Sequence, residues 1–135
     1  MFAGDEAIVD LLDGADIHVS FITDVELLAT SRITVAQTKN IRAFLDQCRI
    51  IGAELDVRTY AIEFRKASGL KLPDCIIAAT AAYLNMPLVT GDKQFSQLEK
   101  EIALFRLCRL PTCQLHAFCA QAPCLPLIRH LELVR

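Results

Sequence analysis

The chain has 135 residues, of which 53% are hydrophobic, and this supply of apolar side chains suffices for the core of one domain. A net charge of -2, with 14 basic and 16 acidic residues, excludes the global positive charge that gives nucleic-acid binding without sequence preference. No secretion signal is evident at the N-terminus, and the apolar stretch 76–84 is too short to cross a bilayer. We therefore expect a cytoplasmic protein without membrane contact.

The first part of the sequence predicts a helix followed by a strand. Residues 6–12 carry apolar side chains at helical spacing, and Asp13-Gly14 ends that pattern. Apolar and polar residues then alternate over 17–21, which predicts a strand that runs into Thr23. We expect the next helix to begin directly after this strand.

The following segment predicts two helices around a short strand. Thr34 is suited to cap a helix whose apolar face includes Ile41, and an apolar strand is expected near residues 50–51. Asp56 is suited to cap the next helix, which we expect to end near Gly69.

A buried helix and two further strands complete the periodic part of the chain. Pro73 fits the first turn of a helix that is apolar nearly all round over 74–84. Residues 88–90 predict a short buried strand before the Gly91-Asp92 turn, and a helical turn and a last strand over 102–107 follow. Strands that alternate with helices predict an α/β fold with a parallel sheet between helices.

Residues 108–135 have a different character from the rest of the chain. Cysteines and prolines recur here without a clear period, at Cys108, Pro111, Cys113, Cys119, Pro123, Cys124 and Pro126. The spacing of these cysteines is marginal for structural zinc. Two other interpretations of this tail stay open. It is either a segment outside the domain's evolved design or an apolar helix that docks on a partner. We expect a domain at 1–107 and a separate tail at 108–135.

Three acids stand where predicted strands end or a predicted helix begins. Glu26 lies three residues after Thr23, where a capping box is one interpretation. Asp74 follows Pro73 at a helix start, which the helix dipole favours, and Asp92 is a common turn residue. At the carboxyl edge of a parallel sheet, however, the three acids would repel one another without a bound cation. Ligation by oxygen alone favours Mg²⁺ or Mn²⁺ over zinc.

Three segments carry a resemblance to a known family in their order and spacing. They are Phe-Ile-Thr-Asp-Val-Glu-Leu-Leu at 21–28, the segment 69–80 with Leu72-Pro73-Asp74, and Leu-Val-Thr-Gly-Asp-Lys-Gln-Phe at 88–95. These segments are similar to motifs of the PIN-domain family, over about residues 5–107. The middle segment most resembles the small ribonuclease toxins of VapBC toxin–antitoxin pairs.

The resemblance implies a three-layer α/β/α fold and a ribonuclease that uses Mg²⁺ or Mn²⁺. Its metal ligands, which are also its catalytic residues, fall on Glu26, Asp74 and Asp92. Thr90 falls on a polar position beside the site. Lys71 and Lys93 flank the acids. They either steer an RNA backbone or are ordinary solvated lysines of the surface. The implied partners are an RNA substrate, an antitoxin and a second copy in a homodimer.

The family pattern also has an aspartate at the end of a first strand that lies centrally in the sheet. Asp5 and Asp10 are the nearest acids, but they belong to the opening predicted helix. We therefore expect a chain that lacks this strand and one ligand, with a slot left in the sheet. Two functions stay open: an endoribonuclease toxin, and an inactive remnant that acts only as a protein-binding module. A receiver-like phosphoacceptor domain would need paired acids after a first strand.

Overall fold

Short strands form the centre of the molecule in the computed structural model, which describes residues 16–31, 33–106 and 133–134. They build a five-stranded sheet in the order β2-β1-β5-β3-β4. The strands are β1 (His18–Ser20), β2 (Arg49–Ile51), β3 (Leu88–Thr90), β4 (Leu104–Arg106) and β5 (Leu133–Val134). β1 and β3 are buried along their whole length, as expected for strands inside an α/β sheet.

The direction of the strands fixes which loops meet at one edge of the sheet. β1 is parallel to β2, and β3 is parallel to β4, as predicted. β5 is the exception, because it is antiparallel to both of its neighbours, β1 and β3. β1 and β3 therefore run in the same direction, and their carboxyl ends lie at the same edge.

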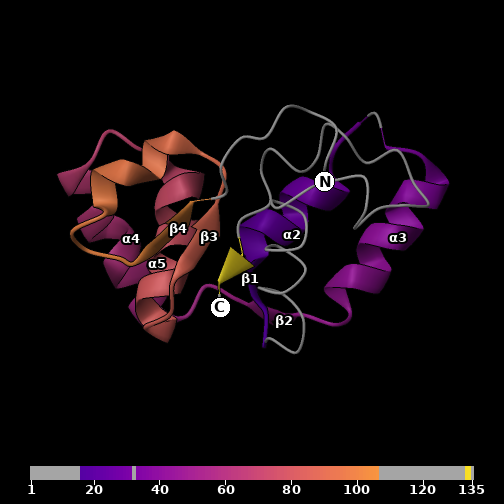
Figure 1. Cartoon of the computed structure of the whole chain (residues 1–135), viewed down its shortest axis with the longest axis horizontal. Coiled ribbons are helices and arrows are strands. Elements are labelled where there is room, and N and C mark those ends of the chain that lie inside the picture. Colours follow the sequence, from indigo (N-terminus) through magenta and orange to yellow (C-terminus); the bar gives the residue numbers. More distant parts are fainter. Residues whose placement is uncertain (1–15, 32, 107–132, 135) are drawn as a thin grey trace, which may run out of the picture.

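The helices form two groups, one on each side of β5 (Figure 1). They are α2 (Phe21–Leu28), α3 (Val35–Leu45), α4 (Leu55–Ala67), α5 (Leu72–Leu84) and the short 3-10 helix η1 (Lys93–Leu98). α2 and α3 pack with β1 around a small core that contains Val19, Leu27 and Ile41. α4, α5 and η1 form a larger core, in which Ile77 and Phe95 are almost fully buried.

Helix α5 ends where its sequence predicts and begins at Leu72, two residues before the predicted start. Pro73 occupies its first turn, and Asn85 ends it in the left-handed conformation, with φ at 52°. Its alanines pack closely inside the larger core, and Ala78, Ala79 and Ala81 have no exposed surface. Because alanine combines high helix propensity with a small side chain, this helix lies against α4 without steric cost.

Two predicted helix caps are wrong. α2 begins at Phe21 with Ser20 as its cap, so the strand ends before Phe21, and Thr23 lies buried inside the helix. Ser20 caps instead because it is the last residue of β1, directly before the helix, and its side chain accepts a bond from a helix N–H, that of Ile22. α4 has Glu54 at its cap position, and Asp56 lies in the first turn, where the helix dipole favours an acid without a capping bond.

Several predictions fall on residues that the structure does not describe. The helix predicted over 6–12 and the four tail cysteines lie outside the described ranges. β5 belongs to the predicted tail and lies within the sheet, whereas the proposed boundary at residue 107 stays a prediction. Within the described residues, no helix is both long and apolar enough to span a membrane.

The cap of α3 offers a test of how local structure contributes to stability. Thr34 Oγ1 accepts a hydrogen bond from Gln37 N at 3.2 Å, and Gln37 Oε1 accepts one from Thr34 N at 2.8 Å. We expect Thr34→Ala to lower the free energy of unfolding by about 1 kcal/mol, measured by urea denaturation. Thr59→Ala is the control, because the Thr59 hydroxyl only bonds the Leu55 carbonyl within α4. Equal losses in both variants would contradict the capping role.

Candidate functional site

The junction between β1 and α2 carries the first candidate acid. Ser20 Oγ accepts a hydrogen bond from Ile22 N at 3.3 Å, which turns the chain from strand into helix. Glu26 lies two turns later and is exposed to solvent. Thr23 Oγ1 is buried and has no hydrogen-bond partner among the described residues. A buried hydroxyl without a hydrogen-bond partner lowers the stability of the folded state by roughly 1–3 kcal/mol, so Thr23 is a destabilising feature of this junction.

The junction between β3 and η1 holds Asp92 through two hydrogen bonds. Thr90 is fully buried, and its Oγ1 accepts a bond from Asp92 N at 3.0 Å. Asp92 Oδ1 in turn accepts a bond from Gln94 N at 2.9 Å and caps η1. Thr90 therefore fixes the backbone from which the Asp92 carboxylate projects. One of the two carboxylate oxygens is engaged in the cap.

A side chain that the sequence analysis did not single out joins the segments that carry Asp74 and Asp92. Gln97, on η1, accepts a hydrogen bond from Gly69 N at 2.9 Å through Oε1. A Cβ at Gly69 would lie 3.3 Å from the same oxygen, so the close approach favours glycine. A glutamine in a short surface helix has no sequence pattern that marks it, which explains why it was missed.

Asp74 lies in the first turn of α5 and is half-buried. The loop before it is fixed by Arg65 Nη1, which donates to the Leu70 carbonyl at 2.7 Å. The adjacent Cys75 is fully buried, and burial raises the pKa of its thiol. The negative charge of Asp74 adds a smaller upward contribution to the pKa of Cys75, against the lowering by Ser68 and Arg65. This thiol therefore stays protonated near neutral pH and behaves as a core residue.

The topology brings the elements that follow β1 and β3 to one edge of the sheet, but the three acids do not form a metal site by themselves. α2 and Asp92 follow the carboxyl ends of β1 and β3, and the start of α5 is held to η1 through Gly69 and Gln97. Within residues 16–31, 33–106 and 133–134, however, no group of three or more histidines, cysteines, aspartates or glutamates is placed to hold a metal ion. The described residues therefore do not fit a resident Mg²⁺ or Mn²⁺ without a further ligand or a different orientation of side chains.

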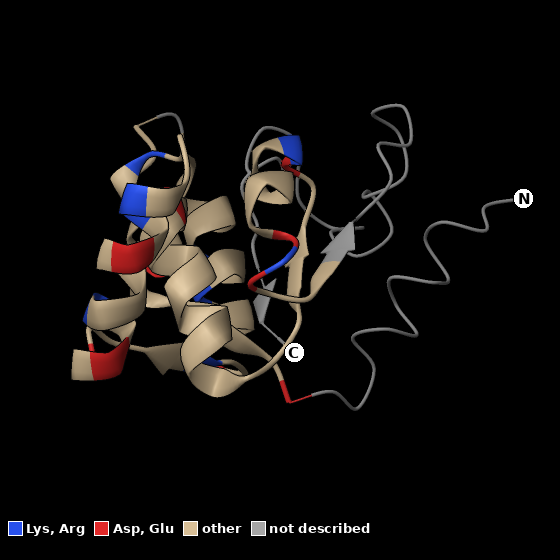
Figure 2. Ribbon diagram, turned by 90° about the vertical axis from the view of Figure 1, so that its left-hand side faces the viewer, with Lys and Arg blue, Asp and Glu red and all other residues tan. Residues whose placement is uncertain are grey.

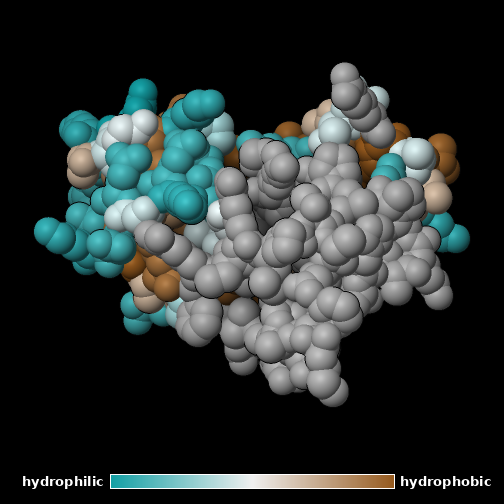
Figure 3. All heavy atoms as spheres, turned by 45° about the horizontal axis from the view of Figure 1, so that its top comes forward, coloured by the Kyte–Doolittle hydropathy of each residue, from teal (hydrophilic) through white to brown (hydrophobic). Residues whose placement is uncertain are grey.

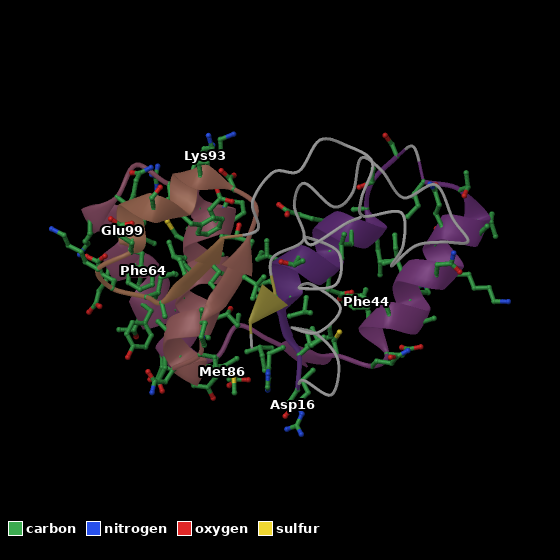
Figure 4. All side chains as sticks on the ribbon, in the orientation of Figure 1. Asp16, Phe44, Phe64, Met86, Lys93 and Glu99 are labelled. Atoms are coloured by element: carbon green, nitrogen blue, oxygen red, sulfur yellow. The ribbon has the colours of Figure 1, made fainter. Side chains whose placement is uncertain are left out.

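The two candidate lysines lie on the surface near the acids. Lys71 occupies the cap position of α5, and Lys93 is the first residue of η1. Both are exposed, and Figure 4 shows the Lys93 side chain directed outward from η1. Figure 2 shows acidic and basic residues interspersed along the ribbon of the described residues in this view. Any attraction for a phosphate backbone is therefore local.

Comparison with known proteins places the chain in a family. The family model described as "PIN domain" matches residues 3–101, so the chain belongs to the PIN-domain family, whose members are typically metal-dependent nucleases. Its structure is also similar to VapC toxins of toxin–antitoxin complexes. The comparison with curated proteins gives no match.

Two solved structures illustrate this similarity. One is a toxin–antitoxin complex from Klebsiella pneumoniae, with a TM-score of 0.64, 25% identity, and coverage of 81% of this chain and 90% of that chain. The other is VapBC2 from Rickettsia felis bound to a DNA fragment from their promoter, with a TM-score of 0.63 and 24% identity. It covers 75% of this chain and 83% of that chain, and its likeness concerns the fold alone.

The hydrogen bond between Thr90 and Asp92 can be tested by an isosteric substitution. We expect Thr90→Val to lower the free energy of unfolding by about 1–2 kcal/mol, because the amide of Asp92 loses its acceptor. Hydrogen exchange at this amide should accelerate as well. Thr80→Val is the matched control, since Thr80 is equally buried and its hydroxyl donates to a carbonyl of its own helix at 2.9 Å. A loss no larger than in this control would refute the role of Thr90.

Proposed function

We propose that this chain is the toxin of a toxin–antitoxin pair and acts in the cytoplasm as an endoribonuclease that hydrolyses RNA phosphodiester bonds. Membership of the PIN-domain family supports the reaction class. The observation that carries the proposal is the common direction of β1 and β3, which brings helix α2, with Glu26, and the turn at Asp92 to the same edge of the sheet. Ligands of α/β sheets gather at this edge.

The proposed cofactor is Mg²⁺ or Mn²⁺, and it rests on the family alone. The described carboxylates do not by themselves fit one metal ion. In this proposal, the protein's own contribution is to hold Asp92 through Thr90 and to present Lys71 and Lys93 to RNA phosphates. Asp74 lies in the first turn of the buried helix α5, near the positive end of the helix dipole.

The proposed partner is an antitoxin protein. The similar Klebsiella pneumoniae structure is a toxin–antitoxin complex, and this chain covers 90% of the matched chain in it. Large apolar side chains reach the surface of the helices, among them Leu55, Ile62 and Leu72, each more than half exposed. Figure 3 shows hydrophobic patches among hydrophilic residues. Such exposed apolar side chains suit a protein partner, either the antitoxin or a second copy.

Cleavage of RNA by a pair of matched variants tests the proposed reaction. We expect the full chain to cleave RNA with Mn²⁺, and Asp74→Asn to lower the rate by at least about a hundredfold, because it removes a carboxylate at the sheet edge. Asp56→Asn is the matched control, since it also neutralises a first-turn acid of a 13-residue helix. Gel analysis of a labelled RNA gives the rates. Equal rates for Asp74→Asn and the unmodified chain would rule out the assignment.

A protein-binding module without catalytic activity is the second candidate function. Two observations favour it: no group of three potential metal ligands occurs in the described part of the chain, and β5 occupies the position between β1 and β3. Such a chain would keep the exposed surfaces that a partner contacts. It would not need Glu26, Asp74 or Asp92.

Titration of the full chain with Mn²⁺ discriminates between the two functions. The nuclease proposal predicts binding by calorimetry, weakened at least about tenfold by Asp92→Asn. Asparagine is also a good cap, so this variant is expected to keep η1 folded. If the chain does not bind Mn²⁺, the result would favour the protein-binding module. Equal Mn²⁺ affinity of Asp92→Asn and Asp56→Asn would also favour it.

A further inference from the structure

The surface of α4 carries a line of exposed side chains on the side opposite the core. Leu55 is 71% exposed, Ile62 is 55% exposed, and Thr59 lies between them. Residues three and four positions apart share one face of an α-helix, so these three side chains form one line, which we call the α4 stripe. The buried residues of α4 lie on the opposite side of the helix and are Val57, Ala61 and Phe64.

The apolar part of the α4 stripe distinguishes α4 from the other described helices. On α2, α3 and α5, one large apolar side chain per helix is more than half exposed, and these are Val25, Val35 and Leu72. Single exposed apolar residues are normal on a protein surface, whereas two in line on one face form a continuous patch. Figure 1 shows α4 at the end of the molecule away from α3. The patch is therefore open to a partner.

Charged residues of opposite sign lie on the two sides of the α4 stripe. Arg58 and Arg65 lie along one side, and Asp56 and Glu63 lie along the other. The members of each pair are seven residues apart, which is close to two turns, so each pair stays on its own side of the stripe. All four residues are exposed. The stripe thus has a basic flank and an acidic flank.

This distribution of charge is complementary to itself in one orientation. When two copies of α4 lie side by side and parallel, the basic flank of one copy meets the acidic flank of the other. In heptad terms Ile62 occupies a d position, Arg58 the preceding g position and Glu63 the following e position. Arg58 of one copy therefore lies opposite Glu63 of the other. In an antiparallel pair each flank meets its own kind, and like charges disfavour that arrangement.

We infer that the α4 stripe is the contact surface for a second copy of this chain, in a two-fold dimer whose α4 helices are parallel. Leu55 and Ile62 pack against their counterparts, and Arg58 pairs with Glu63 on both sides of the contact. Lys66 continues the line beyond Ile62 and meets its own counterpart, so the close contact ends at Ile62. A contact of this size forms a weak and reversible dimer. The inference depends neither on nuclease activity nor on an antitoxin.

A symmetric disulfide tests the orientation of the two helices. In the parallel dimer the same position of both copies meets at the stripe, so the full chain with Ile62→Cys forms a disulfide with its own counterpart on mild oxidation. Ile62 is more than half exposed, so this variant is expected to fold. Ala43→Cys, at an exposed position of α3, is the control. Mass spectrometry of the linked peptides separates these links from links through native cysteines.

A mixture of two variants reports the opposite orientation. An antiparallel pair centred on the stripe places Leu55 of one copy near Lys66 of the other. In the parallel dimer these positions are about 16 Å apart along the helix axis, too far for a disulfide. A mixture of Leu55→Cys with Lys66→Cys therefore gives a link between positions 55 and 66 only if the helices are antiparallel.

Reversal of charge tests the ion pair between the copies. Arg58→Glu and Glu63→Arg each place like charges opposite each other, and we expect each variant to raise the Kd of the dimer at least about fivefold at low salt. The double variant Arg58→Glu/Glu63→Arg restores opposite charges, so its Kd should return to within about twofold of that of the unmodified chain. Sedimentation equilibrium gives the Kd values. Arg42→Glu, the same change at an exposed position of α3, is the control.

We expect the link between two copies of position 62 to increase with chain concentration, and the double variant to restore the dimer. An unmodified chain that stays monomeric at about 1 mM would overturn the dimer and leave the α4 stripe to a partner of another kind. A link between positions 55 and 66 in place of the symmetric link would overturn the parallel orientation. A double variant that is as weak as either single variant would overturn the ion pair.

Discussion

The parallel alignment of β1 and β3 is the constraint on which the rest of the structure depends. The two strands are not direct neighbours, because each pairs with β5, and their common direction follows from that shared partner. It brings the end of β1, with α2, and the end of β3, with Asp92, to the same edge. Without it, the acids of the candidate site would lie on opposite edges of the sheet.

Two hydrogen bonds between loops position the groups at this edge of the sheet. Thr90 holds the backbone of Asp92, and Gln97 holds the loop at Gly69 that leads into α5. Both bonds involve η1 or its cap, so this short helix links the strand that delivers Asp92 with the helix that carries Asp74. The site is thus positioned mainly by polar contacts between loops, on top of a sheet that is held by apolar burial.

The sequence predicted those features that depend on local chemistry. Pro73 marked the first turn of α5 and Asn85 its end, and the predicted Thr34 cap is present in the structure, where Gln37 completes it. The cap of α2 was misplaced because Ser20 and Thr23 are both good capping residues, and only the end of the strand decides between them. A local sequence pattern does not identify the cap of a helix when two nearby residues are both suited to that position.

Features that depend on distant contacts were not predicted. β5 lies in a segment whose sequence has no clear period, so no local pattern predicts its place between β1 and β3. The orientation of the candidate acids was likewise open, because the spacing of the sequence does not reveal that the Glu26 side chain is exposed. The contact between Gln97 and Gly69 spans 28 positions and has no local signature.

The pairing of His18 with Val134 also bears on the order in which the chain folds during synthesis. α4 and α5 are adjacent in sequence and pack directly against each other, so this pair of helices forms from local contacts soon after it leaves the ribosome. β1 is synthesised earlier than these helices, yet its place beside β5 is completed only when residues 133–134 emerge. Through this interval, among the residues that the structure describes, the β1 edge that faces β5 is without its strand partner, and such an edge is a site where another chain can pair.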